Sequence, residues 1–412
     1  MNRVVVTSVS AVTPLGNDVE TSWQNLLAGK SGIGKITKFD ASDHDTKIAG
    51  EVKDFDPTVF INKKEARRME TFTQYAVCAT KMLFDNAGWT IPDSEKERAG
   101  TCVGVGLGGL QAIEDMHSKM LSKGPGRISP FFIPVIIANM AAGLVSIEAG
   151  AMGPNTCTTT ACASGTHAIG SAYTDIAMGR ADVMTCGGSE STISKLGIAG
   201  FNAMKALSVR NDEPEKASRP FDADRTGFIM GEGCGMLLLE SLEHAEKRGA
   251  NILAEVVGAG ASGDAHHMTA PPEDGAGMAL AMAAAVREAG IDPSQVDHIN
   301  AHGTSTKLND LCETRAIKKV FGDHAYNIKI AANKSQIGHL LGAAGGVEAV
   351  FAVKTIAEGV VPGTINRDTP DPDCDLDVSA DGPRKEQVEY ALSNSFGFGG
   401  TNGCVLFKRF TG

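Results

Sequence analysis

The sequence of 412 residues contains few aromatic residues, no CxxC pair and no long apolar run. No uninterrupted apolar stretch approaches the roughly 18 residues that a membrane-spanning helix needs, so we expect no membrane insertion. A strand-like run, Arg3–Thr7, begins almost at once, and we therefore expect no signal or transit peptide. Low-complexity segments and charge blocks are also absent. Together with 42% hydrophobic and 21% charged residues, this excludes a disordered or fibrous chain and predicts a globular α/β protein.

Nine cysteines are present, an odd number without close pairs. This pattern argues against a disulfide framework and against a zinc site. We therefore predict a cytoplasmic protein whose cysteines lie mostly in the core, with neither a metal ion nor a cofactor.

The formal net charge is −11, so the average surface repels both nucleic acid and anionic membranes. We expect neither as a partner. An acidic protein partner would need a local basic patch. The densest basic cluster is segment 62–68, in which Lys64, Arg67 and Arg68 have the spacing of one helical face. Such a charge run is otherwise a solvated surface.

Short strands that are β-branched or end in glycine alternate with alanine-rich amphipathic helices, the pattern of helices layered on a sheet. Helices are expected at 75–87, 166–179, 277–289 and 345–358, each closing near a glycine. Two glycine-rich segments, 227–238 and 395–406, share Phe, Gly, Gly and Leu at one constant spacing, and each runs into an apolar strand. The chain is also longer than one hydrophobic core usually serves. We predict a duplicated α/β unit with an N-terminal half at 1–250 and a C-terminal half at 251–412.

Cys162 lies among very small residues in segment 158–170, immediately before an expected helix. Small neighbours leave the sulfur reachable, and the free N–H groups and dipole at a helix start favour an anion. We therefore expect thiolate character and a nucleophilic role. The alternative is a buried structural cysteine.

Two histidines occupy turns instead of core faces. His302 ends a strand in segment 300–306, and His339 lies between a strand and a helix, close to Lys334. Beside an activated cysteine, they are compatible with hydrolysis, acyl transfer or metal binding. Metal binding is the weakest of the three, because the ligands would be widely separated single residues without a supporting carboxylate. The other histidines, including His167, His266, His267 and His298, are expected to be structural or peripheral.

The segments TACASG, HGTSTKLNDLCE, NKSQIGHLLGAAG and NSFGFGGTN resemble those of the β-ketoacyl-[acyl-carrier-protein] synthases, most closely the synthase II group. The resemblance runs from VVVTSVSAVTPLG at the start to GFGGTNGCVLFKRF at the end. It implies the thiolase fold, in which two similar α/β halves form a five-layered α-β-α-β-α sandwich. It also implies an acyltransferase of fatty acid synthesis that condenses acyl-carrier with malonyl-carrier, with loss of the malonyl carboxylate, through an acyl-cysteine.

This resemblance assigns roles to individual residues. Cys162 would accept the acyl group, His302 and His339 would act on the malonyl thioester, and Lys334 would be a charged organiser. The backbone N–H groups of Cys162 and Phe398 would bind the tetrahedral oxyanion. Phe398, between two glycines, would also gate access for the second substrate.

The same resemblance implies further positions around the site. Leu107 and Phe201 would line an apolar tunnel for the acyl chain, and Asp310 and Glu313 would organise the loop of His302. An acyl carrier protein would dock on basic residues, namely Lys64, Arg67, Arg68, Arg127 and Lys205. Such enzymes are typically homodimers, and segment 129–139 would reach the partner's tunnel.

Two alternatives stay open. A coenzyme A-dependent thiolase or priming synthase would share the fold, but priming and chalcone-type enzymes resemble Cys-His-Asn sites, whereas this chain has His339. A catalytically silent chain-length partner subunit would lack the nucleophilic cysteine, and this chain has Cys162.

Overall fold

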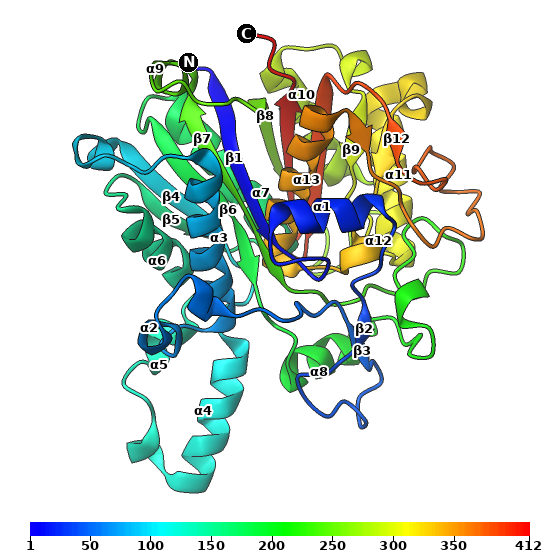
Figure 1. Cartoon of the computed structure of the whole chain (residues 1–412). Helices are drawn as coiled ribbons and strands as arrows, with labels where there is room; N and C mark the ends of the chain where they lie inside the picture. The colour runs from blue at the N-terminus through cyan, green and yellow to red at the C-terminus, as the bar shows by residue number, and fades with distance from the viewer.

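A computed structural model describes the whole chain, residues 1–412. Ten strands form one sheet in the order β10-β9-β13-β14-β8-β1-β7-β6-β4-β5 (Figure 1). The first half of the chain supplies β1 (Val4–Val12), β4 (Ala99–Gly104), β5 (Asn155–Thr158), β6 (Val183–Glu190) and β7 (Gly233–Ser241). The second half supplies β8 (Ala254–Gly263), β9 (His298–Asn300), β10 (Lys329–Ala331), β13 (Tyr390–Gly397) and β14 (Thr401–Lys408).

The two halves have the same strand topology. In each, the first strand pairs antiparallel with the last, which pairs antiparallel with the strand before it, and two parallel strands complete the edge. The halves join where β1 pairs antiparallel with β8 at Val4–Val6. The prediction of two similar α/β halves is therefore confirmed. A domain boundary near residue 250 stays a prediction, because one sheet crosses it.

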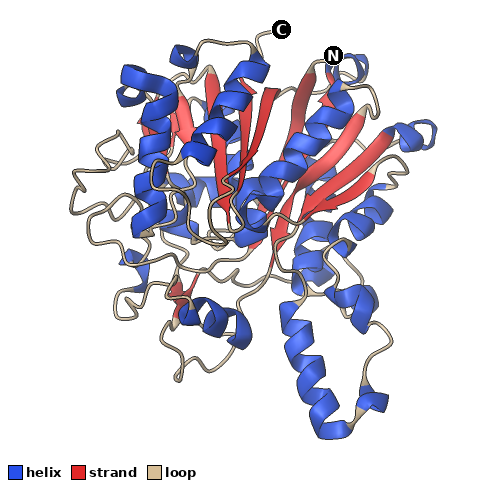
Figure 2. Cartoon of the chain, turned by 180° about the vertical axis from the view of Figure 1, so that it is seen from behind, coloured by secondary structure: helices blue, strands red, loops and turns tan.

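The helices form three layers around and between these strands (Figures 1 and 2). In the first half, α3 (Thr71–Ala87) packs on the outer face of the strands, and α6 (Met140–Ala149) lies beside it. In the second half, α10 (Ala276–Ala289) covers the outer face, and α11 (Lys307–Phe321) packs on α10. Between them, α7 (Ser164–Ala177) and α13 (Ala344–Glu358) contact strands of both halves. This is the predicted five-layered arrangement.

Close contact between the two central helices depends on glycine. A Cβ atom on Gly165 would lie only 2.6 Å from the backbone nitrogen of Gly346. Buried apolar side chains, including Ile169 and Ile176 of α7 and Val350 of α13, then fill the space between the strands of both halves. The glycine clusters in the sequence therefore allow close packing and are not linkers.

The remaining helices are α1 (Val19–Leu27), α2 (Lys63–Ala66), α4 (Leu110–Lys123), α5 (Phe132–Ile136), α8 (Lys195–Ala203), α9 (Leu242–Lys247) and α12 (Lys334–Ile337). Short strand pairs are β2 (Gly34–Lys35) with β3 (Ile48–Ala49), and β11 (Val360–Val361) with β12 (Arg384–Lys385). Figures 1 and 2 show α4 projecting from the body at one end, where α2, α5 and α8 also lie. None of the helices combines the length and apolar character that a membrane crossing needs.

The parallel strands of both halves end near one another. Cys162 follows β5, His302 follows β9, Lys334 follows β10 and Phe398 follows β13. Ligands of open α/β sheets bind outside the carboxyl ends of parallel strands. The topology therefore brings residues that are far apart in the sequence to a single site.

Candidate active site

Cys162 lies in a tight turn between β5 and α7. The turn begins with Ala161, a non-glycine residue in the left-handed region at φ 50°, and continues as the short 3₁₀ turn η4 (Ala161–Ala163). The Ser164 hydroxyl holds it, accepting the Thr160 N–H at 2.9 Å and donating to the Ala161 carbonyl at 2.6 Å. Left-handed backbone at an ordinary residue is strained and is concentrated at functional sites.

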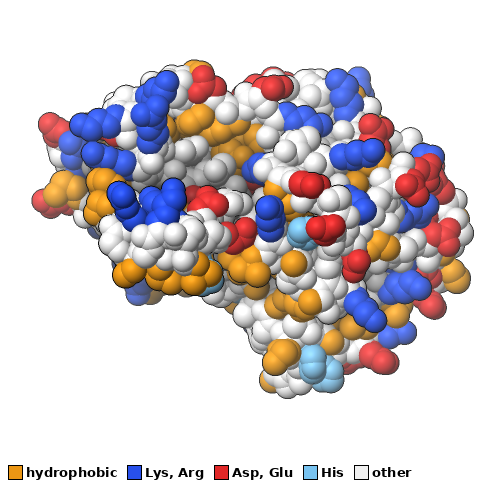
Figure 3. Space-filling model, turned by 90° about the horizontal axis from the view of Figure 1, so that it is seen from below, with side chains coloured by type: hydrophobic (Ala, Val, Ile, Leu, Met, Phe, Trp, Pro, Cys, Tyr) orange, Lys and Arg blue, Asp and Glu red, His pale blue; other side chains and the backbone are white.

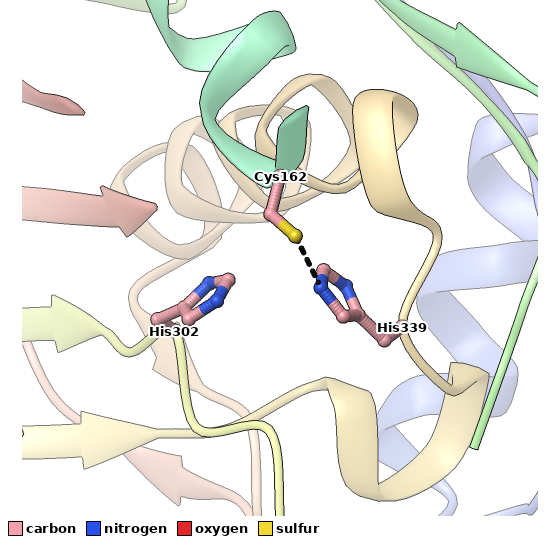
Figure 4. A group of neighbouring side chains, drawn as sticks. All are labelled: Cys162, His302 and His339. Carbon is pink, nitrogen blue, oxygen red and sulfur yellow. Dashed lines mark hydrogen bonds between the residues drawn. The ribbon is translucent and has the colours of Figure 1, made fainter. Parts of the chain in front are cut away.

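Three side chains converge at this turn (Figure 4). The Cys162 Sγ and His339 Nε2 atoms lie 3.0 Å apart, and the rings of His302 and His339 lie 5.2 Å apart between centroids, nearly perpendicular. All three residues are buried. Cys162 comes from the first half of the chain and both histidines from the second, so the site is shared between the halves.

Burial dominates the acidity of the thiol. It raises the pKa of Cys162 to about 12, although the Lys334 ammonium and the backbone N–H groups of Phe398 and Cys162 act in the opposite direction. The expectation of thiolate character from the helix start was wrong, because the desolvation cost of a buried anion exceeds the gain from the helix terminus. The resting group is a thiol against His339, which can accept its proton.

Both histidines are neutral at physiological pH. Burial lowers the pKa of His302 and of His339 well below the usual value, and the Lys334 ammonium lowers both further. A neutral imidazole carries one N–H, so each ring can donate one hydrogen bond to a developing negative charge while the other nitrogen accepts. Two neutral imidazoles beside a sulfur nucleophile therefore suit chemistry in which a negative charge develops on a substrate oxygen.

Lys334 is buried and forms an ion pair with Glu348 of α13. Burial raises the pKa of Glu348 to about 7, against the influence of Lys334. Glu348 was not predicted from the sequence. Its signal was an acidic residue within the apolar run 347–353, a position that requires a buried partner.

Glu313 and Asp310 hold the chain around His302. Glu313 accepts the backbone N–H groups of His302 and Gly303, both at 2.8 Å, and burial raises its pKa to about 7. Asp310 accepts the N–H of Ser305 at 3.2 Å and lies 3.7 Å from Arg225. Both carboxyl groups therefore contact the backbone of the loop or the arginine beside it, and neither belongs to the converging group of Cys162, His302 and His339.

A cavity of about 630 Å³ opens in front of these residues. Its lining includes Cys162, both histidines and three residues predicted for the acyl tunnel and gate, namely Leu107, Phe201 and Phe398. The Phe201 and Phe398 rings lie 6.3 Å apart between centroids. Leu107 is half exposed in the single chain.

Glu190, at the end of β6, was not recognised in the sequence. It is buried and accepts backbone N–H groups from Gly106, Leu107, Gly108 and Gly342 at 2.7–3.3 Å. Burial raises its pKa to about 7. The residue joins the loop of Leu107 to the turn before α13. An acidic residue that ends a run of apolar and small residues, 183–189, was the available signal.

The basic residues predicted for docking are exposed around one end of the molecule. The predicted shared helical face was wrong, since α2 has only four residues and ends at Ala66. Lys64 lies in α2, Arg67 caps it, and the Arg68 guanidinium lies over the Phe131 ring, 4.7 Å from its centroid. Arg127 lies in the turn after α4, and Lys205 lines the cavity. Several Lys and Arg side chains gather on the left of the face in Figure 3, the side on which Figure 1 places α2, α4 and α5.

The sulfur and the histidine nitrogens lie within 4.8 Å of one another, a spacing that a metal ion could bridge. The Lys334 ammonium, however, already lowers the pKa of both histidines by repelling positive charge. The same field opposes a dication at this position.

Comparison with known proteins agrees with this geometry. Residues 1–245 match the family described as "Beta-ketoacyl synthase, N-terminal domain", and residues 253–368 match "Beta-ketoacyl synthase, C-terminal domain". The chain belongs to the β-ketoacyl synthase family. Among curated relatives of the family, proteins called 3-oxoacyl-[acyl-carrier-protein] synthase 2 are 52% identical in Synechocystis sp. and 50% identical in Vibrio harveyi. Each alignment spans 408 residues, 99% of this chain and 98% of the relative.

Solved structures of this family share the fold over the full chain. The complex of a type II PKS acyl-carrier protein with its ketosynthase, AntDE:AntF, gives a TM-score of 0.92 at 35% identity. A β-ketoacyl synthase from Burkholderia phymatum gives 0.92 at 34% identity. Both alignments cover 100% of each chain. The predicted thiolase-type fold and the predicted family are therefore confirmed.

Proposed function

We propose that the chain is a 3-oxoacyl-[acyl-carrier-protein] synthase, an acyltransferase that elongates an acyl chain by condensing it with malonyl-carrier. The observation that carries the proposal is the convergence of the Cys162 sulfur, at 3.0 Å from His339, with the His302 ring in one buried site open to an apolar cavity. Full-length relatives with the same printed function support it.

In the first half-reaction, His339 accepts the thiol proton as the Cys162 sulfur attacks the acyl thioester. A sulfur-carbon bond forms, and the carrier thiol leaves with the proton. The backbone N–H groups of Cys162 and Phe398, both of which lower the pKa of the Cys162 thiol against burial, bind the oxyanion of the tetrahedral intermediate. The acyl chain then extends into the cavity past Leu107 and Phe201.

In the second half-reaction, malonyl-carrier loses its carboxylate and the electron pair passes to the thioester oxygen. His302 and His339, both neutral, donate hydrogen bonds to this enolate; His339 does so as the tautomer that carries its hydrogen on Nε2, the nitrogen that accepted the thiol proton in the first half-reaction. Its carbon attacks the acyl-Cys162 carbonyl, a carbon-carbon bond forms, and the sulfur leaves as a thiolate, which takes a proton from solvent to restore the resting thiol. Burial keeps both imidazoles neutral by lowering the pKa of each, and the Lys334 charge adds to this effect. We assign Asp310 and Glu313 to holding the His302 loop.

The carrier, the oligomer and the compartment belong to the same proposal. The exposed basic group Lys64, Arg67, Arg68, Arg127 and Lys205 offers the acidic carrier a docking surface around the cavity. A homodimer is supported by the exposed edge strand β5 and by exposed Phe131, Ile133 and Ile137 near it in the chain. A cytoplasmic location is supported by nine free cysteines.

Incubation with radiolabelled acyl-carrier or acyl-coenzyme A tests the proposal. We expect labelling of the wild type from acyl-carrier and none of a Cys162→Ala variant. Cys157→Ala is the matched control and should label normally. Cys157 is a partly exposed cysteine in β5, the strand that precedes Cys162. Efficient labelling from coenzyme A alone would favour a thiolase or priming synthase, and labelling of Cys162→Ala would contradict the nucleophile.

A further inference from the structure

The two backbone donors for the oxyanion come from different parts of the chain. One belongs to Cys162, in the turn before α7, and the other to Phe398, in the turn between β13 and β14. Both N–H groups act on the same thiol, because each lowers the pKa of Cys162 against burial. Something must fix the separation of the two turns, because an oxyanion hole depends on both donors being held in place before the charge forms.

Thr160 is the residue through which the two turns meet. Its carbonyl accepts the hydroxyl of Thr401 at 2.9 Å, and its own hydroxyl lies 2.7 Å from His167 Nδ1. The backbone is also in close contact here, since a Cβ on Gly397 would lie 2.9 Å from the Thr160 carbonyl oxygen and 3.1 Å from the Cys162 nitrogen.

His167, one turn into α7, completes the connection. Its Nε2 lies 3.1 Å from the carbonyl oxygen of Asn402 in β14. A carbonyl only accepts, so Nε2 carries the hydrogen; burial lowers the pKa of His167, so the ring is neutral and Nδ1 accepts the Thr160 hydroxyl. Each nitrogen therefore has one partner, and the ring bridges the Cys162 turn to the strand that follows Phe398.

The space around the ring is closed. A Cβ on Gly403 would lie 2.9 Å from two atoms of the imidazole, so the strand approaches the ring as closely as a glycine allows. The imidazole has no contact with Cys162, His302 or His339 among its hydrogen bonds. Its effect on the reaction must therefore pass through the backbone.

We propose that His167 is a positioning residue for acyl transfer, which with Thr160 holds the Cys162 turn and the Phe398 turn at the separation that aims both backbone N–H groups at the oxyanion. The inference rests on the proposed function, because it concerns the acylation step. It replaces the expectation that His167 is peripheral.

The test uses His167→Ala, His167→Gln and Thr160→Val in the full-length enzyme. Glutamine places its amide near the position of Nε2 and keeps a donor for Asn402, whereas alanine loses both contacts. His324→Ala, which removes a histidine that is bonded to the Val296 carbonyl and does not line the cavity, and Thr174→Val on the exposed side of α7 are the matched controls. Two rates are measured separately: acylation of Cys162 from labelled acyl-carrier, and decarboxylation of malonyl-carrier, which uses the histidines and not the oxyanion hole.

For His167→Ala we expect acylation to slow by about 10- to 100-fold, below the about 10²–10³ that loss of a whole oxyanion donor costs. Decarboxylation should be unchanged, and His167→Gln should recover part of the acylation rate. Acylation at the wild-type rate in His167→Ala, or equal loss of both rates, would overturn the inference. Absence of labelling in the wild type would instead contradict the proposed function.

Discussion

Replacing Lys334 by methionine leaves Glu348 as a buried carboxyl group without its cation. Removing one partner of a buried ion pair typically costs about 3–5 kcal/mol. The loss should depend on pH. Burial already raises the pKa of Glu348 to about 7, and Lys334 is the main influence that lowers it, so the variant's pKa lies higher still.

The sign follows from proton binding. Where the folded pKa of a carboxyl group is raised, the free energy of unfolding falls as pH rises from the unfolded pKa to the folded pKa. Above the folded pKa it no longer changes with pH. The wild type becomes level above about pH 7, whereas the variant continues to lose about 1.4 kcal/mol per pH unit. The two proteins should therefore differ little at pH 6 and by about 3 kcal/mol at pH 9.

Urea unfolding of both proteins between pH 6 and 9 measures this difference. The double variant Lys334→Met with Glu348→Gln removes the carboxylate as well and should recover most of the stability at pH 9. Its malonyl decarboxylation should still show an acidic limb at higher pH than the wild type, because the charge that lowers the pKa of both histidines is gone. An equal loss of stability at pH 6 and pH 9 would refute this account of Glu348.

Three further predictions follow from other contacts. His244 hydrogen-bonds Glu240 at 2.5 Å and Glu95 at 3.1 Å, and these contacts raise its pKa. Its contribution to the stability of the fold is therefore complete below the unfolded pKa of about 6.5 and is lost as pH rises through the folded pKa. The melting temperature of His244→Gln should lack this fall with rising pH, and an unchanged fall in the variant would contradict the prediction. Alkylation of Cys162 by iodoacetamide should rise about tenfold per pH unit from pH 7 to about 9.5, since the thiol pKa is about 12, whereas a plateau near neutral pH would show an activated thiolate. Reversing Lys64, Arg67 and Arg68 to glutamate should raise KM for acyl-carrier roughly tenfold and weaken its salt dependence, while a small thioester substrate reacts as before; equal effects on both substrates would argue against docking there.

Much of the architecture could be predicted from local patterns. The expected helices at 75–87, 166–179, 277–289 and 345–358 correspond to α3, α7, α10 and α13, because alanine-rich amphipathic segments that end in glycine carry both their period and their stop signal. The repeat of Phe and Gly around 228 and 396 precedes β7 and β14, which occupy equivalent places in the two halves.

The electrostatics of the site could not be predicted in the same way. The position of Cys162 before a helix suggested an anion. The atoms that bury the sulfur, however, come from both halves of the chain, so the extent of burial is set only by the fold. The partners Glu348 for Lys334, and Asn402 for His167, lie far away in the sequence, and no local spacing connects them. A local spacing can also mislead. Lys64, Arg67 and Arg68 have helical spacing in the sequence, yet the helix ends at Ala66.

The duplication also explains why the chain has a single nucleophile. The turn before α13 repeats the turn before α7: Leu341, like Ala161, is a non-glycine residue in the left-handed region, at φ 49°, and opens a 3₁₀ turn, η8 (Leu341–Ala343). The position equivalent to Cys162 is Gly342, and a Cβ there would overlap the backbone nitrogen of Gly106. No side chain fits at the second turn, so the first half supplies the sulfur while the second half supplies His339, two residues before its own turn. One active site built from two similar halves is the consequence of this unequal packing.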